Sequence, residues 1–346
     1  MMMMMKSGPG QGASDTMTNG NLANTLTETW ARQGRDGFLL SDPASAEIET
    51  KIARDPATGA AFRFRWMPHR EIRGDVKELE NRGIMNPRRG DYELFADPRD
   101  PHGRHCFLCE RNIRVVHPME ELVPIEAGGR TYLAGANFAW IEFNHYTIMD
   151  KEHTDQRYSR QALQAAVDLH RQTGGAYRVL FNGPGAGASI PWHFHFQVTT
   201  EAMPIETVPA DRLDAYPTAV RRFVTSEAPP RRAAAGSTQH DGNGERLGHG
   251  PGIDEAHAYA EAWINRDPEH HTVNLLIATP EGESAASLWI FLRDQRRAKA
   301  EGKGLVGGFE VAGDFVLSAP NERPTFDSAD ASTARRILEQ IRPDAD

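Results

Sequence analysis

Apolar side chains recur along the chain with two different periods. Alternating apolar and polar residues at 62–66 (FRFRW) predict a β-strand, because successive side chains of a strand point to opposite faces. Residues 159–172 instead carry apolar side chains three and four positions apart, at Leu163, Ala166 and Val167. This is the spacing of one face of a helix. The chain therefore combines both kinds of element.

The same two periods predict further elements along most of the chain. Helices are expected at residues 21–33 and 254–265 and near the C-terminus, where Asp327 and Ser328 carry a capping signal. Strands are expected at 132–141, 145–149, 178–181, 193–200, 271–278, 287–292 and 314–317. This order favours an α+β fold with an antiparallel sheet and flanking helices packed on one side of it.

Two stretches lack large apolar residues and are predicted to lie outside the folded core. Residues 1–25 are rich in Gly, Ser, Thr and Asn and are expected to form a disordered leader. Residues 226–252 are rich in Pro, Arg, Ala and Gly, which favours a flexible loop or linker. The linker would separate a first half, 26–225, from a second strand-rich half, 253–346, that packs on it. The two halves are expected to be related in plan, without a residue-by-residue repeat.

The composition is that of a globular protein with a sizeable core. The chain has 346 residues, of which 39% are hydrophobic and 25% charged. Its net charge of −9 argues against a general binder of nucleic acid or anionic membranes, which would carry a basic face. No stretch approaches the roughly 18 consecutive apolar residues of a membrane span. If the ligand is an anion, the positive potential must come from a local cluster.

The densest concentration of chemically active residues is the segment 182–197 (NGPGAGASIPWHFHFQ). On a strand, His193, His195 and Gln197 would share one face, while the intervening apolar residues point into the core. A polar row beside an apolar row needs partners if it is buried. A plain hairpin, with glycines in the turn and histidines paired across a sheet, would give the same pattern.

The residue types in this segment suit chemistry at phosphorus. A neutral imidazole is a good nucleophile near neutral pH, because its ordinary pKa is about 6.5. Attack by His195 would give a phosphoramidate of high transfer potential. The glycine-rich run can turn several backbone N–H groups toward one phosphate. Gln197 can donate a hydrogen bond to a phosphate oxygen but cannot accept a proton, which makes it a poor base for activating water.

The chain has two cysteines, Cys106 and Cys109, in the sequence CFLC. Two thiolates at this spacing can supply half of a tetrahedral zinc site, so that histidines must complete it. His145, His153 and His193 are the candidates. The alternative is a pair of buried, reduced cysteines near a turn. The low cysteine content favours a cytoplasmic protein, since structural disulfides are typical of oxidising compartments.

Taken together, these motifs resemble the histidine-triad superfamily, and within it the nucleotidyltransferase and phosphorylase branch. That branch includes galactose-1-phosphate uridylyltransferase, diadenosine tetraphosphate phosphorylase and the GDP-hexose phosphorylases. The chain is most similar to a bacterial family of the branch whose function is unassigned. Order and spacing match over roughly residues 60–210, in the stretches 106–112, 137–138, 145–148, 153–156 and 182–197.

The resemblance implies a role for each motif residue. His195 corresponds to the nucleophile that carries the nucleotidyl group covalently. Gln197 occupies a place where transferases and phosphorylases have Gln and hydrolases usually have a third histidine. A structural zinc ion is implied on Cys106, Cys109, His153 and His193. Nucleotide and phosphate binding is implied for Asn137, Asn182, Gly187, Ser189 and Gln197.

The implied partners are a nucleotide substrate, such as a nucleotide sugar or dinucleoside polyphosphate, and phosphate or a phosphorylated acceptor. No nucleic acid or membrane is expected, and a homodimer stays open. Two alternatives remain: a hydrolase of the same fold, and a non-catalytic, zinc-stabilised nucleotide-binding protein. Trp192 and Trp140 depart from the family pattern, so the choice of base and acceptor does not carry over. Beyond residue 210 the likeness thins to 290–293 and 308–313.

The second half offers two further contributors. One is the segment 270–274, which ends in Asn274, and the other is the Arg/Lys-rich run 293–303. The basic run is expected to form a solvated face.

Overall fold

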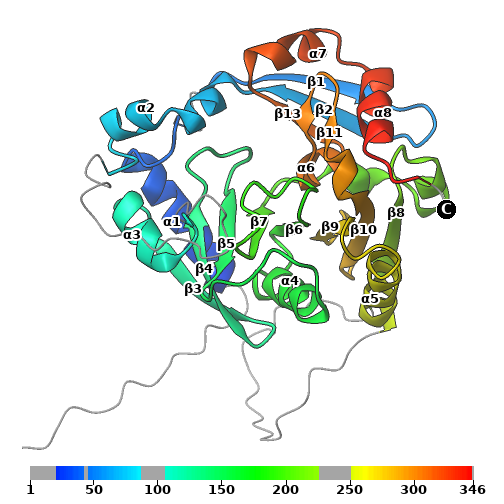
Figure 1. The fold of residues 1–346 in the computed structure, drawn as a ribbon, viewed down its shortest axis with the longest axis horizontal. Helices are drawn as coiled ribbons and strands as arrows, with labels where there is room; N and C mark the ends of the chain where they lie inside the picture. The colour runs from blue at the N-terminus through cyan, green and yellow to red at the C-terminus, as the bar shows by residue number, and fades with distance from the viewer. Residues whose placement is uncertain (1–20, 43–45, 87–105, 226–250, 345–346) are drawn as a thin grey trace, which may run out of the picture.

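The computed structural model describes residues 21–42, 46–86, 106–225 and 251–344. Its centre is an eight-stranded sheet in which every neighbouring pair of strands is antiparallel (Figure 1). The expected α+β class with a large antiparallel sheet is therefore confirmed. The strands follow the order β3 (Leu122–Ala127), β4 (Arg130–Ala136), β5 (Tyr146–Asp150), β7 (His195–Thr199), β6 (Arg178–Asn182), β9 (His271–Ala278), β10 (Ser287–Asp294) and β8 (Val220–Val224).

A second, three-stranded sheet combines two strands from the early part of the chain with one strand from its late part. It consists of β1 (Glu49–Arg54), β2 (Ala61–Trp66) and β13 (Asp314–Leu317) in that order. β2 pairs antiparallel with β1 and parallel with β13. The short strands β11 (Lys299–Ala300) and β12 (Gly304–Leu305) form a separate hairpin.

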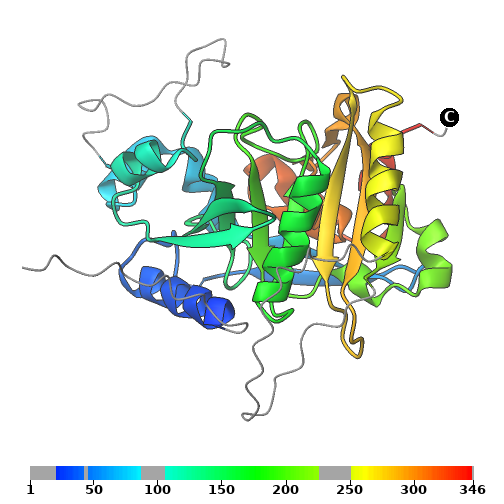
Figure 2. The same ribbon diagram turned by 90° about the horizontal axis from the view of Figure 1, so that it is seen from below.

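One face of the large sheet is covered by α1 (Asn21–Arg35), α4 (Arg160–Gln172) and α5 (Pro251–Ile264) (Figure 2). The apolar face of α4 follows from the spacing of its alanines and leucines, and Leu163 packs in one core with Phe196 of β7 and Leu275 of β9. The helix begins at Ser159, whose hydroxyl accepts the Ala162 N–H at 3.1 Å.

The other face is covered by the small sheet together with α6 (Gly308–Val311), α7 (Arg323–Asp327) and α8 (Ala331–Gln340). Phe64 and Phe315 stack there, with ring centroids 4.6 Å apart. The expectation of helices on one side only was wrong, because alternate residues of the same strands feed both cores. Leu275 of β9 lies in the first core and Leu276 in the second.

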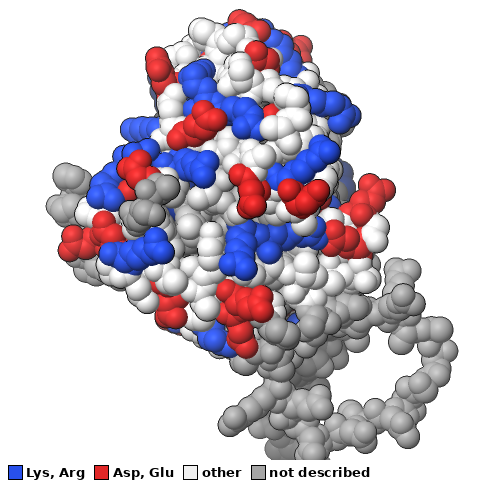
Figure 3. Space-filling view, turned by 90° about the vertical axis from the view of Figure 1, so that its right-hand side faces the viewer, with Lys and Arg blue, Asp and Glu red and all other residues white. Residues whose placement is uncertain are grey.

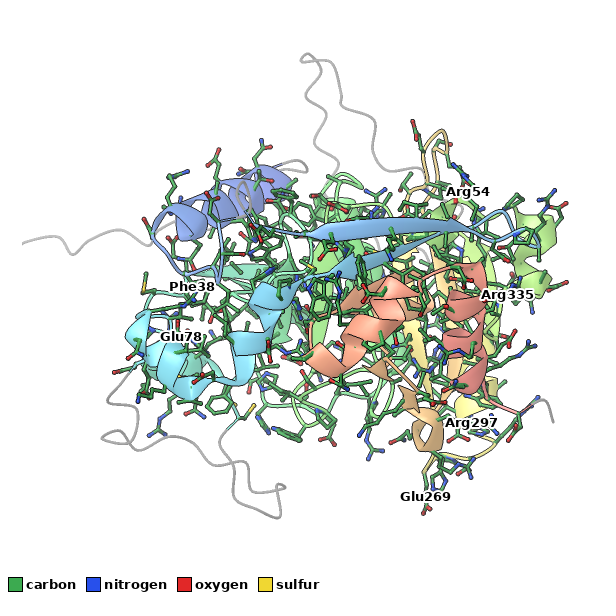
Figure 4. All side chains as sticks on the ribbon, turned by 90° about the horizontal axis from the view of Figure 1, so that it is seen from above. Phe38, Arg54, Glu78, Glu269, Arg297 and Arg335 are labelled. Atoms are coloured by element: carbon green, nitrogen blue, oxygen red, sulfur yellow. The ribbon has the colours of Figure 1, made fainter. Side chains whose placement is uncertain are left out.

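Figure 4 looks onto the small sheet, with α7 and α8 lying beside it. Arg335 of α8 donates two hydrogen bonds to the buried carboxylate of Asp55, at 2.8 and 2.7 Å. Asp55 follows Arg54, the last residue of β1. This ion pair fixes the C-terminal helix to the turn between the first two strands. The shorter helices are η1 (Pro68–Gly74), α2 (Val76–Asn81), α3 (Glu110–Val116), η3 (Pro204–Thr207), η4 (Ala210–Ala215), η5 (Gln295–Arg297) and η6 (Pro320–Glu322).

Most predicted elements are present, and the differences lie at their ends. The strand expected at 132–141 stops at Ala136, because the Asn137 side chain accepts the Ala139 N–H at 3.1 Å and turns the chain. The strand expected from residue 193 begins at His195. The capping residue of the last helix is Asp330, and not Asp327 or Ser328.

The predicted division of the chain into two halves stays a prediction. Helix α1 begins at Asn21, inside the expected leader, and residues 1–20 lie outside the described part. The expected linker falls on residues 226–250, which are also outside it, and α5 begins directly afterwards. Strands from both sides of this segment share one sheet, since β9 and β10 lie between β6 and β8.

Lys and Arg side chains are interspersed with Asp and Glu on the face drawn in Figure 3, so neither sign dominates it. Among the described residues, no helix combines the length and the apolar character needed to cross a membrane.

Candidate active site

The segment singled out in the sequence lies at the centre of the large sheet. β7 runs between β5 and β6, and its residues Phe196 and Val198, with Phe194 just before the strand, are buried in the core beneath the helices. Because side chains of a strand alternate, His195 and Gln197 point to the opposite face, which α6 covers. The predicted sharing of one strand face agrees with this geometry for His195 and Gln197, whereas His193 precedes the strand and its ring faces Cys106 and Cys109.

His195 is held in one tautomer. Its ring is 4% exposed, and Nδ1 lies 2.8 Å from the backbone oxygen of His193. A carbonyl oxygen can only accept, so Nδ1 carries the hydrogen and donates it. Burial lowers the pKa of His195 to about 4, although the hydrogen bond to His193 opposes this effect. At neutral pH the ring is therefore uncharged and Nε2 carries a lone pair.

The amide of Gln156 joins the two strands around this histidine. Its oxygen accepts the His195 N–H at 2.6 Å, while its nitrogen donates to the His195 and Asn182 carbonyl oxygens at 2.8 and 2.9 Å. Gln156 is fully buried. One side chain thus satisfies three backbone groups where β6 ends and β7 begins. Sequence reasoning assigned it no role, although it belongs to one of the matching motifs.

Gln197 is oriented by His145. The His145 Nδ1 accepts the Ile141 N–H at 3.0 Å, so Nε2 carries the hydrogen and donates to Gln197 Oε1 at 2.6 Å. Burial lowers the pKa of His145 to about 3, and the nearby Arg70 charge lowers it further. The consideration of His145 as a metal ligand was wrong. It instead fixes which end of the Gln197 amide presents N–H groups.

Asn137 reaches the same place through Thr147. The Asn137 and Gln197 amide nitrogens both lie 3.3 Å from the Thr147 hydroxyl oxygen. Two of the residues expected to bind a nucleotide therefore converge on one hydroxyl. Trp140, which departs from the family pattern nearby, is buried and donates to the Ser41 backbone oxygen at 3.1 Å. Its indole is a packing element.

The glycine-rich loop is held by residues of the second half. Asn182 Oδ1 accepts hydrogen bonds from Asn274 Nδ2 at 2.8 Å and from the Gly308 N–H at 2.7 Å. Asn274 also donates to the Ala186 backbone oxygen at 2.7 Å. Asn274 was considered only as a contributor of the second half, and the structure brings it directly against Asn182.

Glycine is required at position 187 for two reasons. Its φ of +102° lies where side chains are disfavoured, and a Cβ there would be 2.2 Å from the Gly307 Cα. The loop backbone consequently packs against the turn before α6. Ser189 is exposed at the far end of the loop.

Four side chains form a cluster next to the start of β7. The Cys106 sulfur lies 3.2 Å from His193 Nδ1, and the Cys109 sulfur lies 3.0 Å from His153 Nδ1 and 3.6 Å from His193 Nδ1. All four donor atoms lie within 4.8 Å of one another. His193 Nε2 donates to the Asp150 backbone oxygen at 2.8 Å, which leaves Nδ1 facing the sulfurs.

The cluster has the chemistry and dimensions of a metal site. In tetrahedral zinc sites with S and N ligands, neighbouring S and N atoms are about 3.5 Å apart. The separations in this cluster agree with that value. A hydrogen bond from Cys109 and the neighbouring His193 lower the pKa of the Cys106 thiol to about 4, which favours a thiolate. The residues expected from the resemblance, Cys106, Cys109, His153 and His193, therefore form a group that could bind a metal ion.

The basic run of the second half is not uniformly solvated. Arg296 and Lys299 are exposed as expected, but Arg293 is completely buried and Lys303 is 7% exposed. Arg293 NH1 donates to Asn274 Oδ1 at 2.6 Å. Its sequence signal was the apolar run before it, which predicts a strand that carries Arg293 into the interior.

Comparison with known proteins shows the fold. Residues 75–200 match a family model described as a domain of unknown function, DUF4922. No curated protein sequence matches the chain. The crystal structure of yeast Ap4A phosphorylase Apa2 in complex with AMP has a TM-score of 0.56 and 15% identity, over 94% of this chain and 97% of that one.

Two further structures of the yeast enzyme agree. A second crystal structure of yeast Ap4A phosphorylase Apa2 gives a TM-score of 0.56 with 15% identity, and its complex with Ap4A gives 0.52 with 14% identity. Each covers 94% of this chain and 98% of the other. The expected resemblance to the phosphorylase branch is thereby confirmed at the level of the fold.

The three hydrogen bonds of the Gln156 amide lead to a stability prediction. Gln156→Leu would leave three buried backbone groups without partners, so the free energy of unfolding should fall by about 3 kcal/mol. Denaturant titration of both proteins measures the change. Gln161→Leu, at an exposed glutamine that also makes two hydrogen bonds, should cost less than about 0.5 kcal/mol. Equal stability of the Gln156 variant and wild type would contradict this prediction.

Proposed function

We propose that this protein transfers a nucleotidyl group to phosphate or a phosphorylated acceptor through a covalent intermediate on His195. The observation that carries the proposal is the state of that ring: it is neutral, with Nδ1–H donated to the His193 carbonyl and the Nε2 lone pair available. Every neutral imidazole has one unprotonated nitrogen, and here it is Nε2 of a residue that shares its strand face with Gln197. The fold shared with an Ap4A phosphorylase supports the same class of reaction.

The first step forms a bond from His195 Nε2 to the α-phosphorus of the nucleotide. The bond from that phosphorus to the leaving-group oxygen breaks, and pyrophosphate, a nucleoside phosphate or a sugar phosphate leaves with the electron pair. The ring becomes a positively charged phosphoramidate, because Nδ1 keeps its hydrogen. The His193 carbonyl, 2.8 Å from Nδ1, stabilises this charge.

The second step reverses the bonding with a different oxygen. An oxyanion of inorganic phosphate or of a phosphorylated metabolite attacks the same phosphorus. The nitrogen–phosphorus bond breaks, and its electron pair returns to Nε2. The ring is neutral again without any proton transfer, so the cycle is ping-pong and the protein needs no general base for an ionised acceptor.

The residues around His195 stabilise the charge that develops on the α-phosphate. His145 holds Gln197 Oε1 and Thr147 accepts one amide N–H, so the other N–H of Gln197 would be presented to a nonbridging oxygen. The Asn182 amide and the backbone N–H groups between Gly187 and Ser189 would donate to other phosphate oxygens. Asn137, linked to Gln197 through Thr147, is assigned to the nucleoside.

The cysteine–histidine cluster fits a structural zinc ion held by Cys106, Cys109, His153 and His193. Bound there, the ion would supply a rigid crosslink between the start of α3 and the residues that precede β7. His193 would then hold its carbonyl oxygen in place for the His195 ring.

The proposed substrates are nucleotide sugars or dinucleoside polyphosphates. Of the related crystal structures, one contains AMP and another Ap4A, which supports a nucleotide substrate. A hydrolase of the same fold is the second candidate. Gln197 is the observation against it, because an amide cannot take the proton of an attacking water at neutral pH. A non-catalytic nucleotide binder would form no covalent adduct.

The nucleophile assignment is tested by trapping. Wild type incubated with an α-³²P-labelled nucleotide substrate should acquire acid-labile, base-stable label, and His195→Asn should acquire none while keeping its circular dichroism spectrum and thermal transition. Because the pKa of His195 is lowered to about 4, labelling should stay constant from pH 8 to pH 6 and fall only as the pH approaches that value. Label retained by the His195 variant would refute the assignment.

Metal analysis tests the cluster. Wild type prepared without chelators should contain about one zinc ion per chain, as one four-ligand site requires. Cys106→Ser should lose the metal and unfold at a lower temperature, because metal binding is coupled to folding. His270→Gln, at a partly exposed histidine outside the cluster, should keep both metal and stability. Wild type that contains no metal would refute the proposed zinc site.

The acceptor separates transferase from hydrolase. Turnover should rise steeply with added phosphate or a phosphorylated metabolite and yield a nucleoside diphosphate or a nucleotide sugar. Gln197→His should shift the product toward the nucleoside monophosphate, since an imidazole can assist water. Full-speed release of monophosphate by wild type without any acceptor would favour the hydrolase instead.

A further inference from the structure

A group of buried charges lies beside the glycine-rich loop, on the face of the sheet that carries His195. Arg293 of β10 is 0% exposed, Arg70 of η1 is 6% exposed and Lys303 is 7% exposed. Lys303 pairs with Glu310 at 3.5 Å and with Glu322 at 3.4 Å. The charge of Glu310 also acts on Arg70 and on Arg293. Glu310 thus interacts with all three cations.

Two of these cations have unused hydrogen-bond donors. Arg293 NH1 donates hydrogen bonds to Asn274 Oδ1 and to the Val306 backbone oxygen, at 2.6 and 3.1 Å. Its Nε and NH2 have no partner in the described part of the structure, and neither has Nε of Arg70. Buried donors of this kind are rarely left unsatisfied in native proteins. These donors therefore require a hydrogen-bond acceptor that is not part of the described chain.

The charges in this group do not balance. Arg70, Arg293 and Lys303 carry three positive charges, whereas Glu310 and Glu322 supply two negative ones. The other cation that acts on Arg70 from the interior, Arg65, is already paired with Asp314 and Glu142, at 2.5 and 2.7 Å. Arg73 is exposed and adds positive charge only. The neighbouring cluster offsets this difference, because Arg63 and Arg65 face three carboxylates there, Asp314, Glu142 and Glu201. The unused donors, and not a net charge, are therefore what calls for an acceptor.

Arg293 is linked by hydrogen bonds to the residues around His195. A continuous set of hydrogen bonds runs from the His195 backbone through Gln156 to Asn182, then through Asn274 to Arg293. Strands β7 and β10 are three strand spacings apart, about 14 Å. The long arginine side chain spans part of that distance toward the loop.

Backbone groups lie close to the Arg293 guanidinium on the side of the glycine-rich loop. Val306, whose carbonyl accepts from Arg293, precedes Gly307, and Gly307 packs against Gly187. The Asn274 side chain joins Arg293 to the loop that is proposed to hold the α-phosphate, because it bonds both the guanidinium and the Ala186 carbonyl.

We propose that Arg293 forms a second anion subsite that binds a phosphate group next to the α-phosphate site. Arg70, which shares Glu310 with Arg293, adds positive charge to this subsite. This inference rests on the proposed function, since it assigns the subsite to the acceptor phosphate or to the distal phosphates of the nucleotide. The guanidinium Nε and NH2 donate to two oxygens of that phosphate, the side-by-side geometry in which arginine binds phosphate most strongly.

Thermal unfolding of the full-length protein tests the subsite. Inorganic phosphate alone should raise the transition temperature of wild type, and it should do so additively with a nucleoside monophosphate, because the two occupy different places. Arg293→Met should bind phosphate at least tenfold more weakly while keeping the response to the monophosphate. That retained response shows that Asn182 and the loop are still in place. The matched control Arg296→Met removes an exposed arginine three residues away and should behave as wild type.

A nucleoside triphosphate distinguishes the two sources of the phosphate. If the subsite takes the distal phosphates, wild type should bind the triphosphate more tightly than the monophosphate, and Arg293→Met should lose that preference. If it takes free phosphate, the response to inorganic phosphate is lost instead. Arg70→Met provides the same readouts should Arg293→Met fail to fold.

The subsite is refuted if the arginine variants keep the wild-type responses to both phosphate and triphosphate, or if wild type responds to neither. Ordered water would then satisfy the unused donors. The labelling experiment keeps the two proposals separate. A labelled adduct without arginine-dependent phosphate binding refutes the subsite alone, whereas arginine-dependent binding without an adduct refutes the proposed transfer.

Discussion

The hydrogen bond from His195 Nδ1 to the His193 carbonyl is the interaction on which the site depends. It fixes the tautomer of the buried ring and leaves Nε2 unprotonated. The carbonyl can do so only if His193 itself is held, and its ring lies between the cysteine sulfurs and the Asp150 backbone oxygen. The cysteine–histidine cluster and the His195 ring are therefore coupled through one residue, and a displacement of His193 in the cluster would move the carbonyl that holds the His195 ring.

The face of the sheet around His195 is polar at its centre, which is costly for the fold. Asn182, Asn274 and Arg293 come from three neighbouring strands and hydrogen-bond to one another across that face. The first core, beneath the helices, is apolar and provides the stability against which this polar row is maintained. The arrangement explains why the strands of the second half are built into the same sheet: without β9 and β10, Asn182 and the glycine-rich loop would lose their partners.

Much of the candidate site could be read from the sequence, because its groups are close together along the chain. Residues 193–197 alternate, so the sharing of one face by His195 and Gln197 follows from strand geometry alone. Position along the chain was a poorer guide for polar residues without a neighbouring motif. His145 was considered as a metal ligand by residue type, yet it lies across from Gln197 because β5 and β7 are neighbours in the sheet.

The sequence by itself indicated the periods of the elements, which depend on local geometry, and its resemblance to a known family implied the four residues of the cysteine–histidine cluster and the proposed role of His195. Only the tertiary structure decided which distant groups meet: Gln156 with the backbone of two strands, Asn274 with Asn182, and Arg293 with an incomplete set of partners. The physical reason is that a buried polar group takes the partner that strand order brings beside it. That order is set by the packing of the whole sheet, and no short stretch of sequence specifies it.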